Sequence, residues 1–227
     1  MELGVEVVPL SFQKFLRSIS SVIGYFDFVS IPECPFGKLM PSSLVLSVVA
    51  RGFGVKAVPN YRVMDRSELG FLSEMIALSE IGIRRIVIVR GDLPSIGLPT
   101  HLNPVSAIKL LKEHGIRMEI GVTSPVKPTE SLKAKIEAGA DFVVTQPIQS
   151  EEEVVDLIDL LEGTPLYVMV MLGIEELDAR VLRDMGINEV KRVDYRELIR
   201  ELERSSKVKG VIISSPKGIS KAIELLR

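Results

Sequence analysis

The chain has 227 residues, 46% of them hydrophobic, which is enough apolar material for one large domain or two small ones. Its 28 basic and 30 acidic residues leave a net charge of −2, so the composition lacks the basic excess typical of nucleic-acid-binding proteins. One cysteine, Cys34, and two histidines exclude an internal disulfide, a cysteine metal cluster and a site built on histidines alone.

Apolar runs typical of buried strands alternate with amphipathic, helix-like segments along the whole chain. The strand-like runs lie at residues 4–9, 27–31, 55–58, 85–89, 117–122, 141–147, 166–171 and 208–213. Helix-like segments lie at residues 12–23, 42–50, 69–81, 103–114, 132–137 and 154–161, with two more within 174–205 and one after the last strand. The pattern predicts an α/β fold, a single (β/α)8 TIM-type barrel over residues 1–227, with a doubly wound open sheet as the alternative.

Several helix ends carry capping signals. Residues 65–68 and 150–153 have the spacing of capping boxes, and Asn103-Pro104 suits the cap and first turn of the next helix. His114, just before a glycine, is typical of a helix end, where it complements the helix dipole.

The fourth strand-like run ends in Arg90-Gly91-Asp92-Leu93-Pro94, which places an acid at the carboxyl end of a strand. Sites of α/β proteins are built at these ends, although a helix-capping or turn role would also explain Asp92. Asn60 and Gln146 end two other strands and would meet Asp92 at the mouth of a barrel. An amide such as Gln146 there is either a ligand donor or a packing residue bonded to backbone.

Glu6 lies within the apolar first strand, between valines. Burial disfavours the charged carboxylate, so we expect a raised pKa that suits a general acid working near neutral pH. The equally weighted alternative is an ion pair inside the barrel with Lys56 or Arg90.

Three segments resemble the signatures of methylenetetrahydrofolate reductases, and their order and rough spacing also match. They are Glu6-Val7-Val8-Pro9, Arg90-Gly91-Asp92-Leu93-Pro94 and residues 137–147, which read Glu-Ala-Gly-Ala-Asp-Phe-Val-Val-Thr-Gln-Pro. The resemblance covers about residues 3–150. It implies a flavin-bearing (β/α)8 barrel that reduces the methylene bridge of a tetrahydropterin coenzyme, such as 5,10-methylene-tetrahydrofolate, to a methyl group by hydride transfer.

The resemblance also implies roles for single residues. Glu6 would protonate the coenzyme and open its methylene-bridged ring to an iminium, and Asp92 would hydrogen-bond the pterin and stabilise that cation. Gln146 would contact the substrate or a nicotinamide. Residues that fall where the family binds FAD are Asn60, Arg90, Gly91, Asn103, Lys127 and Lys135.

The chain differs from the family pattern at three places. Asn60 stands where many members have a histidine, Pro32 where a threonine is common, and Lys127-Pro128 where His-Pro is usual. A smaller flavin, FMN, is an alternative if residues 214–220 seat a phosphate at a helix N-terminus, although an ordinary β-to-α turn explains that stretch as well.

Other partners and another function are compatible with the same residues. NADH, NADPH or a partner reductase subunit would supply electrons, and the barrel would form a homo-oligomer or bind that subunit. A flavin-free barrel that binds a pterin, for methyl transfer or as a non-catalytic subunit, is the alternative function. We expect a cytoplasmic protein without membrane or nucleic-acid partners, and the scarcity of asparagine and glutamine is typical of thermophiles.

Overall fold

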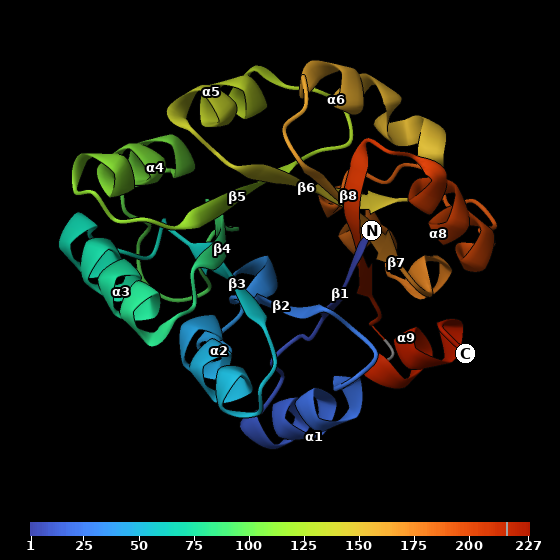
Figure 1. Cartoon of the computed structure of the whole chain (residues 1–227), viewed down its shortest axis with the longest axis horizontal. Helices are drawn as coiled ribbons and strands as arrows, with labels where there is room; N and C mark the ends of the chain where they lie inside the picture. Colours follow the sequence, from blue (N-terminus) through green and yellow to red (C-terminus); the bar gives the residue numbers. More distant parts are fainter. Residues whose placement is uncertain (217) are drawn as a thin grey trace.

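The computed structural model describes residues 1–216 and 218–227, without the side chain of Asp184. Eight parallel strands pair in chain order, and the first also pairs with the last, so the sheet closes into a barrel. The helices form a ring around it (Figure 1). The predicted (β/α)8 barrel is confirmed, and the closing pair excludes the open sheet.

The strands are β1 (Glu2–Glu6), β2 (Phe28–Pro32), β3 (Ala57–Arg62), β4 (Arg85–Val89), β5 (Glu119–Ser124), β6 (Phe142–Ile148), β7 (Leu166–Met171) and β8 (Val208–Ser214). The α-helices are α1 (Phe12–Val22), α2 (Ser43–Gly52), α3 (Glu68–Ile81), α4 (Pro104–Glu113), α5 (Glu130–Ala138), α6 (Val155–Leu160), α7 (Ala179–Asp184), α8 (Tyr195–Arg204) and α9 (Ile219–Leu225). Short 3-10 segments are η1 (Pro35–Gly37), η2 (Glu151–Val154) and η3 (Ile174–Glu176).

The capping signals had mixed outcomes. Asn103 forms a capping box with Ser106 at α4, as the sequence suggested. The box expected at residues 65–68 is wrong: Ser67 caps α3, because the Asp65 carboxylate is bound by Arg62 instead. The box expected at residues 150–153 is absent too, since that stretch forms η2 without a side-chain cap.

His114 ends α4 as predicted, and its ring nitrogen lies 3.0 Å from the carbonyl oxygen of Leu110. The first strand ends earlier than its apolar run, at Glu6. A turn follows in which the Leu10 amide donates to the carbonyl of Val8.

The amino-terminal half of the barrel interior is filled by aromatic rings. Phe28, Phe142 and Tyr167 are 4%, 3% and 2% exposed and pack edge to face, with Phe28 and Phe142 each against Tyr167. The guanidinium of Arg85 lies 5.6 to 6.0 Å from the three ring centres. Three interior glycines, one each in β1, β5 and β8, leave room for these rings.

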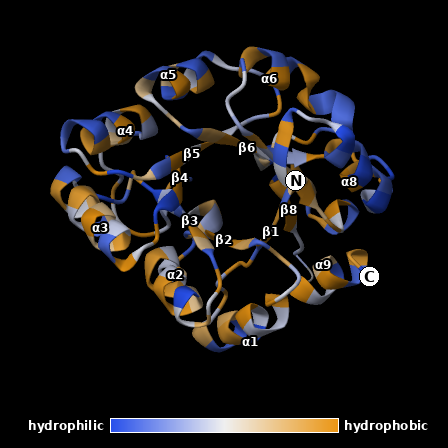
Figure 2. Cartoon of the chain, viewed as in Figure 1, coloured by the Kyte–Doolittle hydropathy of each residue, from blue (hydrophilic) through white to orange (hydrophobic). Residues whose placement is uncertain are grey.

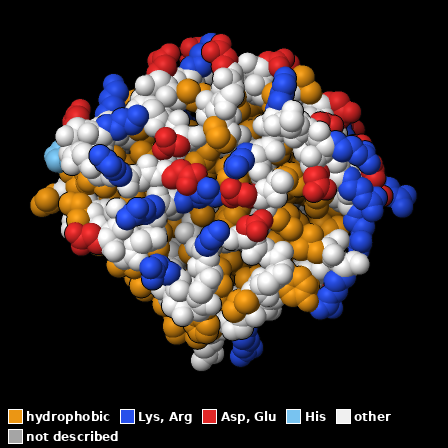
Figure 3. Space-filling model, viewed as in Figure 1, with side chains coloured by type: hydrophobic (Ala, Val, Ile, Leu, Met, Phe, Trp, Pro, Cys, Tyr) orange, Lys and Arg blue, Asp and Glu red, His pale blue; other side chains and the backbone are white. Residues whose placement is uncertain are grey.

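The helices bury their apolar faces against the outside of the barrel. In α8, Leu198 and Leu202 are buried, and its hydrophilic residues lie toward the outside of the ring (Figure 2). Over the centre of the face shown in Figure 3, acidic and basic side chains are interspersed. Among the described residues, no helix combines the length and apolarity needed to cross a bilayer.

Candidate functional site

Side chains alternate between the two faces of a strand, so the interior glycine and aromatic positions show which later residues also face inward. Glu6 follows the interior residue Gly4 by two positions, and Ser214 follows Ile212 of the interior cluster in the same way. Asn60 and Gln146 likewise follow Val58 and Val144. Each of these polar residues lies near the carboxyl end of its strand, so the barrel interior changes from apolar to polar toward that end.

A cavity of about 530 Å³ opens at this carboxyl end, between the interior, the loops after β2 and β4, and helix α5. Its volume lies within the range of about 300–1,000 Å³ typical of small-molecule sites. Seven of the nine predicted site residues line it: Asn60, Arg90, Gly91, Asp92, Asn103, Lys135 and Gln146. The fold therefore brings together residues that lie up to 86 positions apart in the chain.

Glu6 is not among the residues that line this cavity, although it faces the interior at the same end of the barrel. Its Oε1 accepts a hydrogen bond of 2.7 Å from the hydroxyl of Ser214, which is 3% exposed. Burial raises the pKa of the Glu6 carboxyl, and the Ser214 hydrogen bond offsets part of that rise. No ion pair joins Glu6 to Lys56, Arg90 or any other described residue, which argues against the salt-bridge alternative.

The raised pKa of Glu6 predicts a dependence of stability on pH. Its contribution to the free energy of unfolding is fully present below the ordinary value of 4.5 and is lost as the pH rises from there through the raised folded-state value. Relative to Glu6→Gln, the wild type should lose about 1.4 kcal/mol per pH unit across that window. Urea unfolding of both proteins at several pH values measures this, and parallel curves would contradict it.

Asp92 is exposed in the loop after β4, and its Oδ2 accepts a hydrogen bond of 2.8 Å from the backbone amide of Phe36. It caps no helix, because Asn103 occupies the cap of α4. The carboxylate therefore joins two loops at the rim of the cavity, where it is also available to a ligand.

Two cations line the cavity without a carboxylate partner among the residues that the structure describes. Lys135, on α5, is half-buried, and its ammonium group donates to the carbonyl of Thr123 at 2.9 Å. Burial lowers the pKa of Lys135. The guanidinium of Arg90 makes no hydrogen bond or ion pair to another described residue. Together with the N-terminus of α4, whose Pro104 and Val105 also line the cavity, these groups favour an anionic ligand.

The other residues predicted to bind a cofactor have mixed positions relative to the cavity. Lys127 is exposed and does not line the cavity, so its role in cofactor binding stays a prediction. The Oδ1 of Asn103 accepts from the Ser106 amide, which leaves its NH₂ group for a ligand. In the stretch suggested for an FMN phosphate, Ser214 is bonded to Glu6 and Lys217 lies outside the described residues.

The sequence did not indicate the contacts of two residues that the structure makes prominent. Ser214 is the partner of Glu6, and the two lie 208 positions apart. The alternation of β8 placed Ser214 on the interior face, but no pattern in the sequence named its partner. Arg62 is the last residue of β3, and its guanidinium is buried between the loops that carry Asp92 and Cys34.

A larger hollow, of about 1590 Å³, lies at the opposite end of the barrel. Its lining includes Glu2, Arg85 and Glu119, and Arg85 donates to both carboxylates at 2.7 and 2.8 Å. Because these charges satisfy one another, and because barrel enzymes carry their sites at the carboxyl ends of the strands, we place the site in the smaller cavity.

Solved structures resemble this fold at low sequence identity. A Clostridium thermocellum protein described as binding two copies of 5-methyl-5,6,7,8-tetrahydrofolic acid is 14% identical, with a TM-score of 0.70 over 99% of this chain and 93% of that one. A tryptophan synthase complex from Pyrococcus furiosus is also 14% identical, with a TM-score of 0.62 over 94% of this chain and 86% of the other. At such identities the likeness concerns the fold alone.

Sequence similarity, unlike the likeness of the folds, identifies a family. A 5,10-methylenetetrahydrofolate reductase from Pectobacterium carotovorum subsp. carotovorum is 28% identical over 139 residues, which cover 57% of this chain and 47% of that protein. The chain thus spans about half the length of this curated relative. The family described as methylenetetrahydrofolate reductase matches residues 13–174, more than half of the chain, a region that contains Asn60, Asp92 and Gln146 but begins after Glu6. The chain therefore belongs to the methylenetetrahydrofolate reductase family.

Proposed function

We propose that this chain reduces a methylene-bridged tetrahydropterin, such as 5,10-methylene-tetrahydrofolate, to its 5-methyl form with a flavin. The main support is the cavity at the carboxyl end of the barrel, where Asp92 and Gln146 lie together with Arg90 and Lys135, two cations that have no carboxylate partner among the described residues. Family membership supports the same reaction.

The donor set of the cavity fits a flavin nucleotide. Arg90, Lys135 and the N-terminus of α4 would hold its phosphates, and Gly91 and Asn60 would lie against the rest of the cofactor. A bound flavin would supply the hydride, received in turn from NADH or NADPH. Of the two flavins FAD and FMN, we expect FAD, because the chain belongs to this family.

The chain's own residues would then bind the pterin and move a proton. Glu6, whose pKa is raised by burial, would give its proton to the nitrogen released when the methylene-bridged ring opens. The carboxylate of Asp92 would stabilise the resulting iminium cation, and the amide of Gln146 would hold the pterin. The hydride and this proton together convert the bridge into a methyl group on one nitrogen and an N–H on the other.

The test is anaerobic turnover by the purified chain. We expect the chain to take up FAD and, with NADH or NADPH, to convert 5,10-methylene-tetrahydrofolate to 5-methyltetrahydrofolate. A chain that takes up neither flavin nor folate would contradict the proposal.

A second candidate is a flavin-free barrel that binds a methylated pterin, for methyl transfer or as a subunit of a reductase complex. It is favoured by the Clostridium thermocellum protein, which is described as binding 5-methyltetrahydrofolic acid and matches the fold over nearly its full length. Binding of 5-methyltetrahydrofolate without uptake of FAD or FMN would select this candidate over the first.

The two lysines near the cavity should differ in their effects on cofactor affinity. Lys135→Met removes a half-buried cation that has no carboxylate partner among the described residues, so we expect the dissociation constant for FAD to rise about tenfold or more. Lys127→Met, which changes an exposed lysine outside the lining, is the matched control and should have a much smaller effect. Fluorescence titration measures both constants, and equal effects would contradict the assignment of Lys135.

A further inference from the structure

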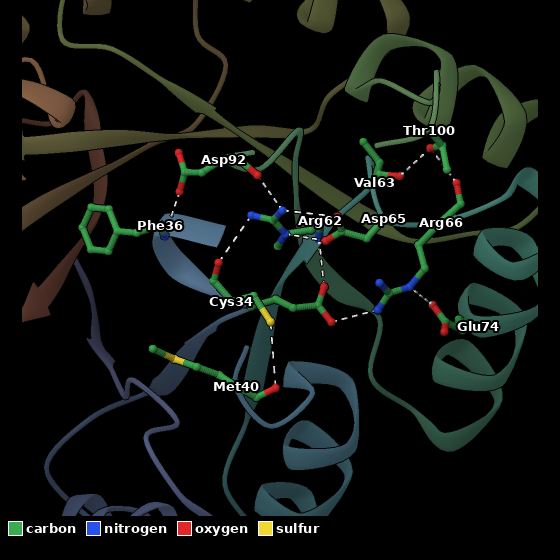
Figure 4. A network of polar contacts seen from close by, with 11 residues as sticks. Cys34, Phe36, Met40, Arg62, Val63, Asp65, Arg66, Glu74, Asp92 and Thr100 are labelled. Atoms are coloured by element: carbon green, nitrogen blue, oxygen red, sulfur yellow. Dashed lines mark hydrogen bonds and ion pairs between the residues drawn. The ribbon is translucent and has the colours of Figure 1, made fainter. Parts of the chain in front are cut away.

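Three loops at the carboxyl end of the barrel converge on the side chain of Arg62, the last residue of β3 (Figure 4). Arg62 is 1% exposed. Its Nε donates to Asp65 Oδ2 at 2.6 Å, its Nη2 to the carbonyl of Asp92 at 2.6 Å, and its Nη1 to the carbonyl of Cys34 at 3.3 Å. One guanidinium thus links the loop after β2, the end of β3 and the loop after β4.

The loops after β2 and β4 also bind each other directly. The Phe36 amide donates to the carboxylate of Asp92 at 2.8 Å, and the Ser95 amide donates to the carbonyl of Gly37 at 2.9 Å. The approach is close enough that a Cβ on Gly37 would lie 1.9 Å from the carbonyl oxygen of Leu93. The orientation of the Asp92 carboxylate therefore depends on the position of the neighbouring loop.

Gly91 shows how tightly the guanidinium is packed. Its φ is +94°, a conformation that side chains disfavour, and a Cβ there would lie 2.6 Å from Cζ of Arg62. The flat guanidinium thus lies against the backbone of the residue that precedes Asp92. A lysine has a single ammonium group and could not make the same three divergent contacts.

Arg62 lines the cavity, but most of its hydrogen-bonding capacity is already used. All three of its nitrogens donate to protein oxygens, and its charge is matched by Asp65. Arg90 and Lys135 provide the cations that lack a carboxylate partner in the described part of the cavity. Arg62 is therefore better suited to hold the loops than to hold a ligand.

We propose that Arg62 is a positioning residue, which fixes the Asp92 carboxylate at the cavity rim by clamping residues 33–37 to residues 91–95. The proposal rests on the proposed function only in that Asp92 is taken to bind the pterin. The clamp itself concerns only the contact between the two loops, which can be tested without any ligand.

The first test is amide hydrogen exchange in the full chain. In Arg62→Lys we expect the Phe36 and Ser95 amides to exchange about tenfold faster or more, with the amides of β6 unchanged. Arg66→Lys is the matched control for a guanidinium that holds the loop after β2 alone: Arg66 pairs with Glu33 and Glu74, and among the described residues it makes no hydrogen bond or ion pair to residues 91–95. Unchanged exchange at Phe36 in Arg62→Lys would overturn the proposal.

A second variant covers the case in which Arg62→Lys fails to fold. Asp65→Asn removes the charge partner of the guanidinium from a side chain that is 26% exposed, and so disturbs the clamp while leaving Arg62 in place. We expect faster exchange at Phe36 and Ser95, smaller than in Arg62→Lys. Exchange equal to that of the wild type at both amides would overturn the proposal here too.

The second test joins the clamp to the pterin. The dissociation constant for 5-methyltetrahydrofolate should rise about tenfold in Arg62→Lys and should rise little further in Arg62→Lys combined with Asp92→Asn. If the two substitutions raise the dissociation constant by factors that multiply in the double variant, Arg62 does not act through Asp92. If the wild type binds no folate, the proposed function fails, and the exchange measurement still decides whether the clamp exists.

Discussion

Glu6→Gln should lower kcat for reduction of 5,10-methylene-tetrahydrofolate by about 10²- to 10⁴-fold, the usual contribution of a positioned general acid. The glutamine keeps the shape of the side chain and its contact with Ser214 but carries no acidic proton. Cofactor binding and reduction of the flavin by NADH or NADPH should be unchanged, because Glu6 does not line the cavity where the phosphates would bind.

The matched control for this variant is Glu2→Gln. Glu2 lies on the same strand and the same face, four residues earlier, and binds Arg85 at the opposite end of the barrel. Its loss should lower stability but leave kcat nearly unchanged. Stopped-flow kinetics of the two half-reactions separates the steps, and normal turnover by Glu6→Gln would remove Glu6 from the mechanism.

Gly121→Ala should lower the free energy of unfolding by about 3 kcal/mol, the upper part of the range for overpacking a core. A Cβ at Gly121 would lie 2.3 Å from two carbons of the Phe142 ring, which is itself held against Tyr167. The ring cannot move freely, because Arg85 also packs over it. The smallest possible side chain at this position therefore disturbs the whole aromatic layer.

Two further variants test that explanation. Gly52→Ala changes a glycine at the end of α2 where a Cβ would meet nothing within 4 Å, so we expect a change of less than about 1 kcal/mol. Adding Phe142→Leu to Gly121→Ala should restore part of the loss, since the smaller side chain leaves room for the new methyl group. Urea denaturation measures all three, and an unchanged midpoint for Gly121→Ala would contradict the packing account.

The barrel could be predicted from the sequence because its signal is repeated. Each strand-like run and each helix-like segment is ambiguous alone, but eight alternations leave few folds that satisfy all of them. Local capping was less predictable. Asp65 had the spacing of a cap, yet it is drawn away by Arg62, a contact set by how β3 meets the following loop. Asn103 has no such competitor and caps α4 as expected.

In the site, too, features of single strands were predictable and contacts between distant segments were not. Their positions at the ends of strand-like runs were enough to expect that Asn60 and Gln146 would meet at the mouth of the barrel, and both line the cavity. The partner of Glu6 was not predictable, because Ser214 reaches it only through the closure of β8 against β1. The clamp formed by Arg62 has the same origin, since its carbonyl partners belong to loops 28 and 30 residues away and carry no side-chain signal.

A crystal structure of the chain with bound 5-methyltetrahydrofolate tests the central claim most directly. We predict the pterin ring in the cavity of about 530 Å³, hydrogen-bonded to Asp92 and Gln146, with the carboxyl of Glu6 facing it from the barrel interior. A pterin bound instead in the hollow around Arg85, at the other end of the barrel, would contradict the assignment of these residues.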